Sequence, residues 1–178
     1  YTGPRIGILG KTTVDVDYKT ANGFNSAVIQ ILEHQGGHIF VGAFTDFNNQ
    51  SNKGIYRSGI HYLNSLGEND NRMNFGSRAN GVISSIVRLP DGKFFVAGSM
   101  SEFSKRSVQG IARLNENGSL DTLSVDVINP DPEKKPLNGK DTVSAFNGGL
   151  NGFVSYVFAT SNNSIIAVGT FSAHRKID

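Results

Sequence analysis

The tripeptide Gly10-Lys11-Thr12 has the ending of a phosphate-binding loop, in which a lysine and a hydroxyl residue meet the phosphates. The full motif begins with a glycine at the position where this chain has Arg5. It also requires a helix after the threonine, so that N–H groups point at the phosphates. The β-branched residues Thr13 and Val14 favour a strand instead. We therefore predict a turn here and no nucleotide cofactor.

His34 and His38 flank a Gln-Gly-Gly turn and are candidate metal ligands. Zinc sites in proteins combine histidines with further ligands, usually to a total of four. In this chain the two histidines bracket a predicted hairpin turn, no third ligand lies nearby in the sequence, and there is no cysteine. We expect exposed turn histidines and no metal site.

Four acidic residues lie in predicted loops: Asp70, Asp126, Asp131 and Glu133. They do not follow the calcium-loop pattern, in which oxygen donors alternate and a glycine stands at the sixth place. A glycan-processing enzyme would need two carboxylates about 5 to 10 Å apart. The predicted inner strands supply only Glu33, and no Gly-x-Ser-x-Gly nucleophile motif occurs. We therefore predict no catalytic residue.

The strands and turns that would position any catalytic or binding residues form a repeat. A turn, three or four apolar residues and a glycine recur three times, ending at Gly42, Gly98 and Gly169. The second copy follows the first by 56 residues, and the third follows the second by 71. A glycine at this place fits a strand end or a close approach of another backbone. Large apolar residues after each glycine are expected to fill the space between repeats: Phe44, Phe47, Met100, Phe103 and Phe171.

Short apolar runs separated by Gly, Asn, Asp and Pro predict an all-β fold. No segment has a helical apolar period over ten or more residues. Repeats of about 40 to 60 residues with about four strands are typical of β-propeller blades. The predicted divisions are the outer strands of a preceding blade in 1–23, a blade in 24–79, a blade in 80–150 with a loop insertion at 126–149, and the inner half of a third blade in 151–178.

Two whole repeats and two half repeats are too few for an ordinary propeller ring, which has about four to eight blades. We therefore expect the chain to be part of a larger propeller or assembly. Its partners would be other protein chains or further blades of the same chain. Without them, the half repeats would expose unpaired strand edges.

Composition narrows the functional classes. The 178 residues are enough for one domain with a sizeable core, and 21 glycines indicate many short elements. The net charge of +2, without a strong basic cluster, argues against nucleic acid as a partner. The absence of cysteine excludes a disulfide framework, and no apolar run is long enough to predict a membrane-inserted helix.

The second repeat resembles a known family. Pro90 to Phe103, PDGKFFVAGSMSEF, and Gly110 to Thr122, GIARLNENGSLDT, are similar to the delta-60 repeat. His34 to Phe47 with Gly59 to Asn64 matches the pattern more loosely, and Ser161 to Phe171 matches its first half. The resemblance implies a propeller-like β-repeat fold, found mostly in bacterial secreted or surface proteins and in large multidomain chains. It implies no catalytic residue.

Three functional hypotheses stay open. The first is a non-catalytic structural or interaction module of a larger extracellular, cell-surface or virion assembly, such as a phage tail or fibre. The second is a propeller that recognises a surface glycan or a peptide through its face loops. Its candidate binding residues lie in the proline-rich insertion: Pro130, Asp131, Glu133, Lys134 and Lys135. The third, a glycan-processing enzyme, is disfavoured by the scarcity of carboxylates.

Overall fold

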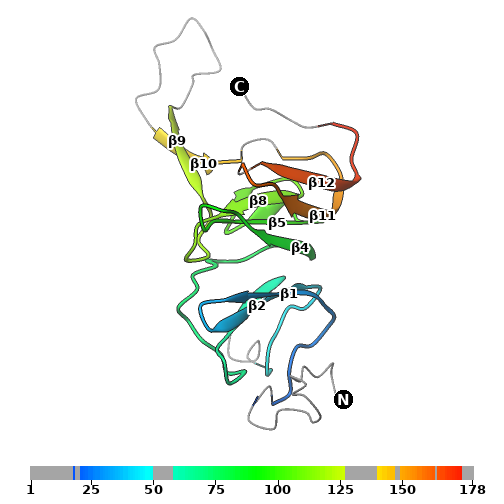
Figure 1. The fold of residues 1–178 in the computed structure, drawn as a ribbon. Coiled ribbons are helices and arrows are strands. Elements are labelled where there is room, and N and C mark those ends of the chain that lie inside the picture. Colours follow the sequence, from blue (N-terminus) through cyan, green and yellow to red (C-terminus); the bar gives the residue numbers. More distant parts are fainter. Residues whose placement is uncertain are drawn as a thin grey trace, which may run out of the picture.

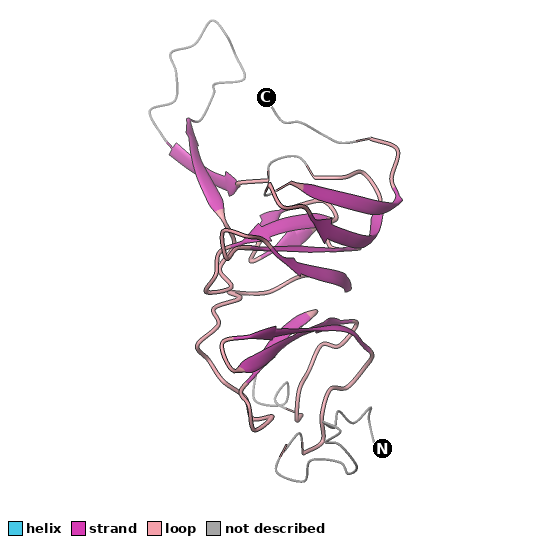
Figure 2. Ribbon diagram, viewed as in Figure 1, coloured by secondary structure: helices cyan, strands magenta, loops and turns pink. Residues whose placement is uncertain are grey.

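The computed structural model describes residues 18, 21–49, 58–126, 140–146, 149–162 and 164–173. Within these ranges every regular element is a β-strand, as Figure 2 shows. No helix long and apolar enough to cross a membrane occurs in the described part of the chain. The predicted all-β fold class is confirmed.

Three small antiparallel sheets repeat along the chain and lie in layers (Figure 1). The first sheet has the order β1-β2-β3, the second β4-β5-β8, and the third β11-β12. Their strands are β1 (Val28–His34), β2 (Gly37–Gly42), β3 (Ile60–Leu63), β4 (Ile83–Arg88), β5 (Phe94–Gly98), β8 (Ile111–Leu114), β11 (Phe153–Ala159) and β12 (Ile165–Thr170). This is the arrangement of a partial β-propeller. The exact division of the chain at residues 23, 79 and 150 stays a prediction.

Two short ribbons lie outside these layers. β6 (Glu102–Phe103) pairs with β7 (Arg106–Ser107), and β9 (Thr122–Asp126) pairs with β10 (Lys140–Ser144). The second ribbon projects beyond the stack in Figure 1. It corrects the prediction of a loop throughout 126–149, because Lys140–Ser144 forms a strand against Thr122–Asp126.

Turn chemistry explains why the first two strands of the first and second sheets form hairpins. Between β1 and β2, Gln35 and Gly36 have φ of 47° and 75°. Two positive φ values are the mark of the type I′ turn that suits twisted strands. Between β4 and β5, Gly92 has φ of 87°, and its N–H donates to the Leu89 carbonyl at 3.0 Å. Sequence reasoning predicted both turns.

The repeated glycine occupies the same register in all three sheets. Gly42 lies opposite Val28, Gly98 opposite Ile83, and Gly169 opposite Val154. A strand irregularity follows each partner, between Val28 and Gln30, Ile83 and Ser85, and Val154 and Tyr156. A Cβ at each glycine would come closer than 3.0 Å to a backbone carbonyl oxygen, those of Ala27, Val82 and Phe153 respectively. The predicted close backbone approach is confirmed.

Strand alternation sends side chains to both faces of each sheet, and three apolar clusters result. On β5, Phe94 and Val96 belong to the cluster shared with the first sheet, whereas Phe95 and Ala97 belong to the cluster shared with the third. The outer face of the first sheet carries its own cluster of buried aromatic and aliphatic residues: Phe24, Phe40, Phe44, Phe47 and Leu63. The middle sheet is therefore covered on both faces.

The apolar residues predicted to fill the space between repeats are all at least partly buried. Met100 and Phe103 lie in the cluster between the first and second sheets, and Phe171 packs against the cluster between the second and third. Phe44 and Phe47 lie on the outer face of the first sheet. The expected filling role is confirmed for Met100, Phe103 and Phe171.

Candidate functional site

An asparagine side chain closes each repeat at the end where the second strand finishes. Asn25, Asn80 and Asn151 each place Oδ1 between two consecutive backbone N–H groups and donate from Nδ2 to a hydroxyl. Asn25 Oδ1 accepts from the main-chain N–H groups of Thr45 and Asp46 at 2.9 and 3.0 Å. Asn80 Oδ1 accepts from those of Ser101 and Glu102 at 3.0 and 2.9 Å. Asn151 Oδ1 accepts from those of Ser172 and Ala173 at 2.9 and 2.8 Å. Nδ2 donates to Thr45, Ser101 and Ser172 at 2.9, 2.8 and 2.8 Å. We call this unit the asparagine staple.

Sequence reasoning missed the staple. The signal was present, because each repeated glycine is followed three residues later by a threonine or serine: Thr45, Ser101 and Ser172. The asparagine lies far upstream and only the fold brings it to this hydroxyl. In an asparagine-rich chain, three positions do not stand out without that pairing.

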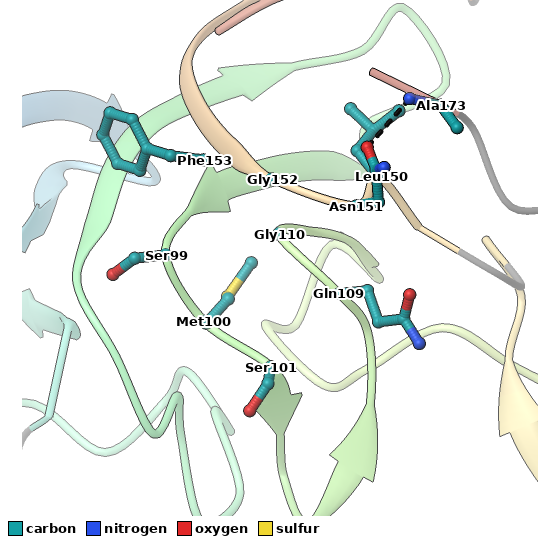
Figure 3. A pocket seen from close by; sticks show the side chains of 10 residues that line it. All are labelled: Ser99, Met100, Ser101, Gln109, Gly110, Leu150, Asn151, Gly152, Phe153 and Ala173. Atoms are coloured by element: carbon teal, nitrogen blue, oxygen red, sulfur yellow. Dashed lines mark hydrogen bonds between the residues drawn. The ribbon is translucent and has the colours of Figure 1, made fainter. Parts of the chain in front are cut away.

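The staples of the second and third repeats border an open groove of about 500 Å³ between the two sheets. Figure 3 shows Ser99, Met100 and Ser101 along one side and the segment 150–153 along the other. Gln109 and Phe153 lie at opposite ends of that view. The ten lining residues that belong to the described part of the chain are uncharged. A mixed apolar and neutral polar lining is typical of small-molecule sites.

The groove is held by contacts between segments that are distant in sequence. The Gln109 carbonyl accepts a hydrogen bond from the Leu150 N–H at 2.7 Å. A Cβ at Gly149 would come too close to the carbonyl oxygens of Val108 and Gln109, so the two segments need a glycine there. Asn151, the residue after Leu150, is held in turn by its staple to the main chain of Ser172 and Ala173. These contacts define the groove shape before any ligand arrives.

A second open groove of about 760 Å³ lies at the hairpin ends of the second and third sheets. Its charged pair, Arg88 and Glu116, meets at 3.4 Å with both side chains about half exposed. Exposed pairs of this kind contribute little to stability or specificity. Asp91 is the third charged residue of its described lining.

The motif residues of the second repeat form an ion cluster. Asp121 Oδ2 accepts from Lys93 Nζ at 2.8 Å and from Arg113 Nε at 2.7 Å. Burial raises the pKa of Asp121, but the hydrogen bonds and charges of Lys93 and Arg113 outweigh it and hold the pKa below its usual value. The cluster ties the hairpin turn to the last strand of the second sheet and its role is structural.

The first repeat replaces this cluster by a different pair. Tyr62 stands where the second repeat has Arg113, and Asp70 pairs with Arg72 at 2.8 Å. The main-chain hydrogen bond from Arg72, with its guanidinium, lowers the pKa of Asp70. Arg72 also lies 5.7 Å from the centre of the Tyr62 ring. Asp70 therefore has a structural partner here.

The exposed position predicted for His34 is wrong. Its side chain is buried, with 1% exposed, and its ring meets the Phe94 ring edge-on at 5.1 Å. The pKa of His34 is lowered, chiefly because burial disfavours the charged ring. The charges of Arg88 and Arg72 lower this pKa further, whereas the carboxylate and main chain of Glu116 raise it. His38 is partly buried and its ring lies 6.3 Å from that of Phe40. Among the described residues no group of three potential metal ligands occurs.

Several predicted residues cannot be compared with the structure. The candidate binding residues Pro130, Asp131, Glu133, Lys134 and Lys135 lie outside the described ranges, as does Gly10-Lys11-Thr12. Asp126 ends β9 opposite Lys140, at the outer end of the ribbon, where the insertion begins. Glu33 is exposed on β1 opposite His38.

The layered sheets and the repeated staple define a β-propeller-type repeat protein. Comparison with protein families agrees, because residues 89–123 match the family described as a beta-propeller domain of unknown function, DUF5122. The match includes strands β5 and β8 and the Lys93–Arg113–Asp121 cluster. No curated protein and no solved structure matches the chain. The delta-60 resemblance is thus supported at the level of a β-propeller repeat family.

Proposed function

We propose that the chain is a non-catalytic structural and interaction module, one part of a larger β-repeat assembly. The observation that carries this proposal is the free face of the third sheet. Each described sheet joins its successor through the same face, and on β11 and β12 this face is exposed.

The register makes the comparison between sheets specific. Phe95 and Ala97 on β5 pack against Val154 and Val157 of the third sheet. Ile166 and Val168 occupy the positions of Phe95 and Ala97 on β12. They are 56% and 50% exposed. A face that receives a sheet in one repeat is therefore uncovered in the next.

Three aromatic residues of β11 are exposed too: Phe153, Tyr156 and Phe158. The Tyr156 and Phe158 rings lie 4.7 Å apart, so the apolar surface is continuous there. Contiguous apolar surface of this kind marks interaction sites in soluble proteins. Its most suitable partner is a further sheet of the same type, from this chain or from another.

The proposed setting is extracellular, on a cell surface or within a virion. It rests on the cysteine-free, glycine-, asparagine- and serine-rich composition and on the resemblance to secreted and surface repeat proteins. Recognition of a glycan or peptide through the insertion is a second candidate.

The proposal is tested by the native mass of the protein and by its association in solution. We expect light scattering and intact mass spectrometry to find either a longer chain or several copies together. Ile166→Lys should reduce association, because it places a charge on the free face. Ser161→Lys, with the same charge on an exposed turn outside that face, should not. A stable monomer of 178 residues at all concentrations would overturn the proposal.

A further inference from the structure

We propose that His34 is a pH-sensitive latch between the first and second sheets: when its buried ring takes up a proton, β1 lifts away from β4. The apolar faces that these two sheets share then become open to solvent. This regulatory device is separate from association through β11 and β12, and neither proposal depends on the other.

His34 occupies a position that is apolar in the next repeat. Glu33 and Arg88 hold equivalent register positions, so the residues after them, His34 and Leu89, are equivalent too. Each of these two side chains faces the following sheet. His34 meets the Phe94 ring of the second sheet edge-on at 5.1 Å, and Leu89 belongs to the cluster shared with the third sheet. At this position the first layer therefore holds a titratable group where the second holds a hydrocarbon.

The His34 ring has no polar partner in its buried position. Its side chain is 1% exposed, and among the residues that the structure describes neither Nδ1 nor Nε2 finds a hydrogen-bond partner. Tyr62 on β3 lies edge-on to the ring at 6.5 Å, and its hydroxyl donates to the His34 carbonyl at 3.1 Å instead. Buried polar groups are nearly always paired, so an unpaired one requires a specific explanation. Opening of the layer would give both ring nitrogens water.

The charged groups around the ring do not neutralise an added proton. Burial lowers the pKa of His34, and the charges of Arg88 on β4 and Arg72 after β3 lower it further. The carboxylate and main chain of Glu116 raise this pKa, but the carboxylate already pairs with Arg88 at 3.4 Å. Arg72 pairs with Asp70 at 2.8 Å. A protonated ring would thus be a further buried cation, which needs the water that the closed layer excludes.

Acid shifts the balance between the closed and open layers in a defined direction. The open layer returns the ring to water, where its pKa is the ordinary 6.5. The closed layer holds this pKa lower, so below pH 6.5 the open state binds a proton that the closed state does not. The ratio of open to closed molecules can then rise by at most about tenfold per pH unit, until the pKa of the closed state is reached.

Two main-chain amides report the two layers separately. The Ile86 N–H donates to Gln30 Oε1 of the first sheet at 2.9 Å, and the Val157 N–H donates to Ser85 Oγ of the second sheet at 3.2 Å. Hydrogen exchange of each amide in the intact chain requires its contact to open. We therefore expect Ile86 to exchange faster relative to Val157 as the pH falls from about 7 to about 5, on the order of tenfold.

The exchange rates are measured by NMR on ¹⁵N-labelled protein and corrected for the intrinsic effect of pH on amide exchange. The ratio of the two corrected rates isolates the first layer, because global unfolding exposes both amides together. A ratio that is constant from pH 7 to pH 5, or two rates that rise in parallel, would overturn the proposal.

Substitutions test whether His34 is the responsible group. His34→Leu places here the residue that the second repeat has at Leu89, and the exchange ratio should become independent of pH. His34→Gln keeps a polar side chain that does not titrate, so it should have the same effect even if His34→Leu fails to fold. His38→Gln is the matched control, because His38 belongs to the same hairpin but lies beside Phe40 on its other face. A pH-dependent ratio in His34→Gln, or a constant ratio in His38→Gln, would refute the latch.

Discussion

The side-chain amide of Gln30 holds both polar groups of the Ile86 main chain. Gln30 Oε1 accepts from the Ile86 N–H at 2.9 Å, and Gln30 Nε2 donates to the Ile86 carbonyl at 2.9 Å. Gln30 lies on β1 and Ile86 on β4, so this pair joins the first sheet to the second. In the next repeat, Ser85 Oγ accepts from the Val157 N–H at 3.2 Å. Ser85 and Val157 hold the corresponding register positions.

Gln30→Ala should destabilise the fold, because it leaves the main-chain groups of buried Ile86 without partners. We expect a loss of about 1 to 3 kcal/mol in the free energy of unfolding. Gln30→Glu keeps the acceptor and loses the donor, so its effect should be intermediate. Urea unfolding followed by circular dichroism measures both. Identical midpoints for wild type and Gln30→Ala would show that water replaces this contact at no cost.

Gly98→Ala should be strongly destabilising, since its Cβ would meet the Val82 carbonyl oxygen and the β4 backbone cannot move away freely. Overpacking of this type costs about 1 to 3 kcal/mol, and more where backbone must shift. Gly36→Asn is the matched control. Its Cβ would have nothing within 4 Å, and asparagine tolerates the φ of 75° there. A thermal scan in which both variants melt together would contradict the close approach.

Asp121→Asn should weaken the second sheet by about 1 to 2 kcal/mol at neutral pH, because Lys93 and Arg113 lose their shared anion. The pKa of Asp121 is lowered in the folded protein, so the unfolded state binds more protons as pH falls. Its contribution is present above the ordinary pKa of 3.8 and is lost as pH falls towards the folded pKa. The difference between wild type and Asp121→Asn should therefore shrink below about pH 4. If the free energies of unfolding of wild type and Asp121→Asn differ by the same amount from pH 7 to pH 2, the stabilising role of the Asp121 carboxylate is refuted.

His34 should make the protein sensitive to mild acid. Its pKa is lowered from the ordinary 6.5, so below that pH the unfolded state binds a proton that the folded state does not. Stability is then full above pH 6.5 and falls as pH drops towards the folded pKa. His34→Phe keeps an aromatic ring beside Phe94 and should remove this part of the pH dependence. Parallel unfolding profiles of the two proteins between pH 5 and pH 7 would contradict it.

Much of the fold could be predicted because local chemistry specifies it. Glycine and asparagine in turns and short apolar runs are local features, and the repetition of Gly42, Gly98 and Gly169 set their order. The strand Lys140–Ser144 was missed because only Val143 of its five residues is apolar. Antiparallel pairing with β9 holds Lys140–Ser144 in a strand although its sequence lacks an apolar alternation.

The groove and the burial of His34 were beyond reach of the sequence for a different reason. Both depend on contacts between sheets, such as His34 with Phe94 and Gln109 with Leu150. A hairpin turn looks exposed when it is read alone, and only the layer above it covers the histidine. The repeat pattern predicts that layers exist but not which side chains meet across them.

Two hydrogen-bonded contacts between successive sheets, Gln30 with Ile86 and Ser85 with Val157, run the same way along the chain. A side chain of the earlier sheet, Gln30 or Ser85, binds the main chain of the later one. The stack therefore has polarity, with two unlike ends. Copies that associate through these ends would meet head to tail, and such a contact either closes into a ring or continues as a filament. A two-fold symmetric dimer would have to use some other surface of the molecule.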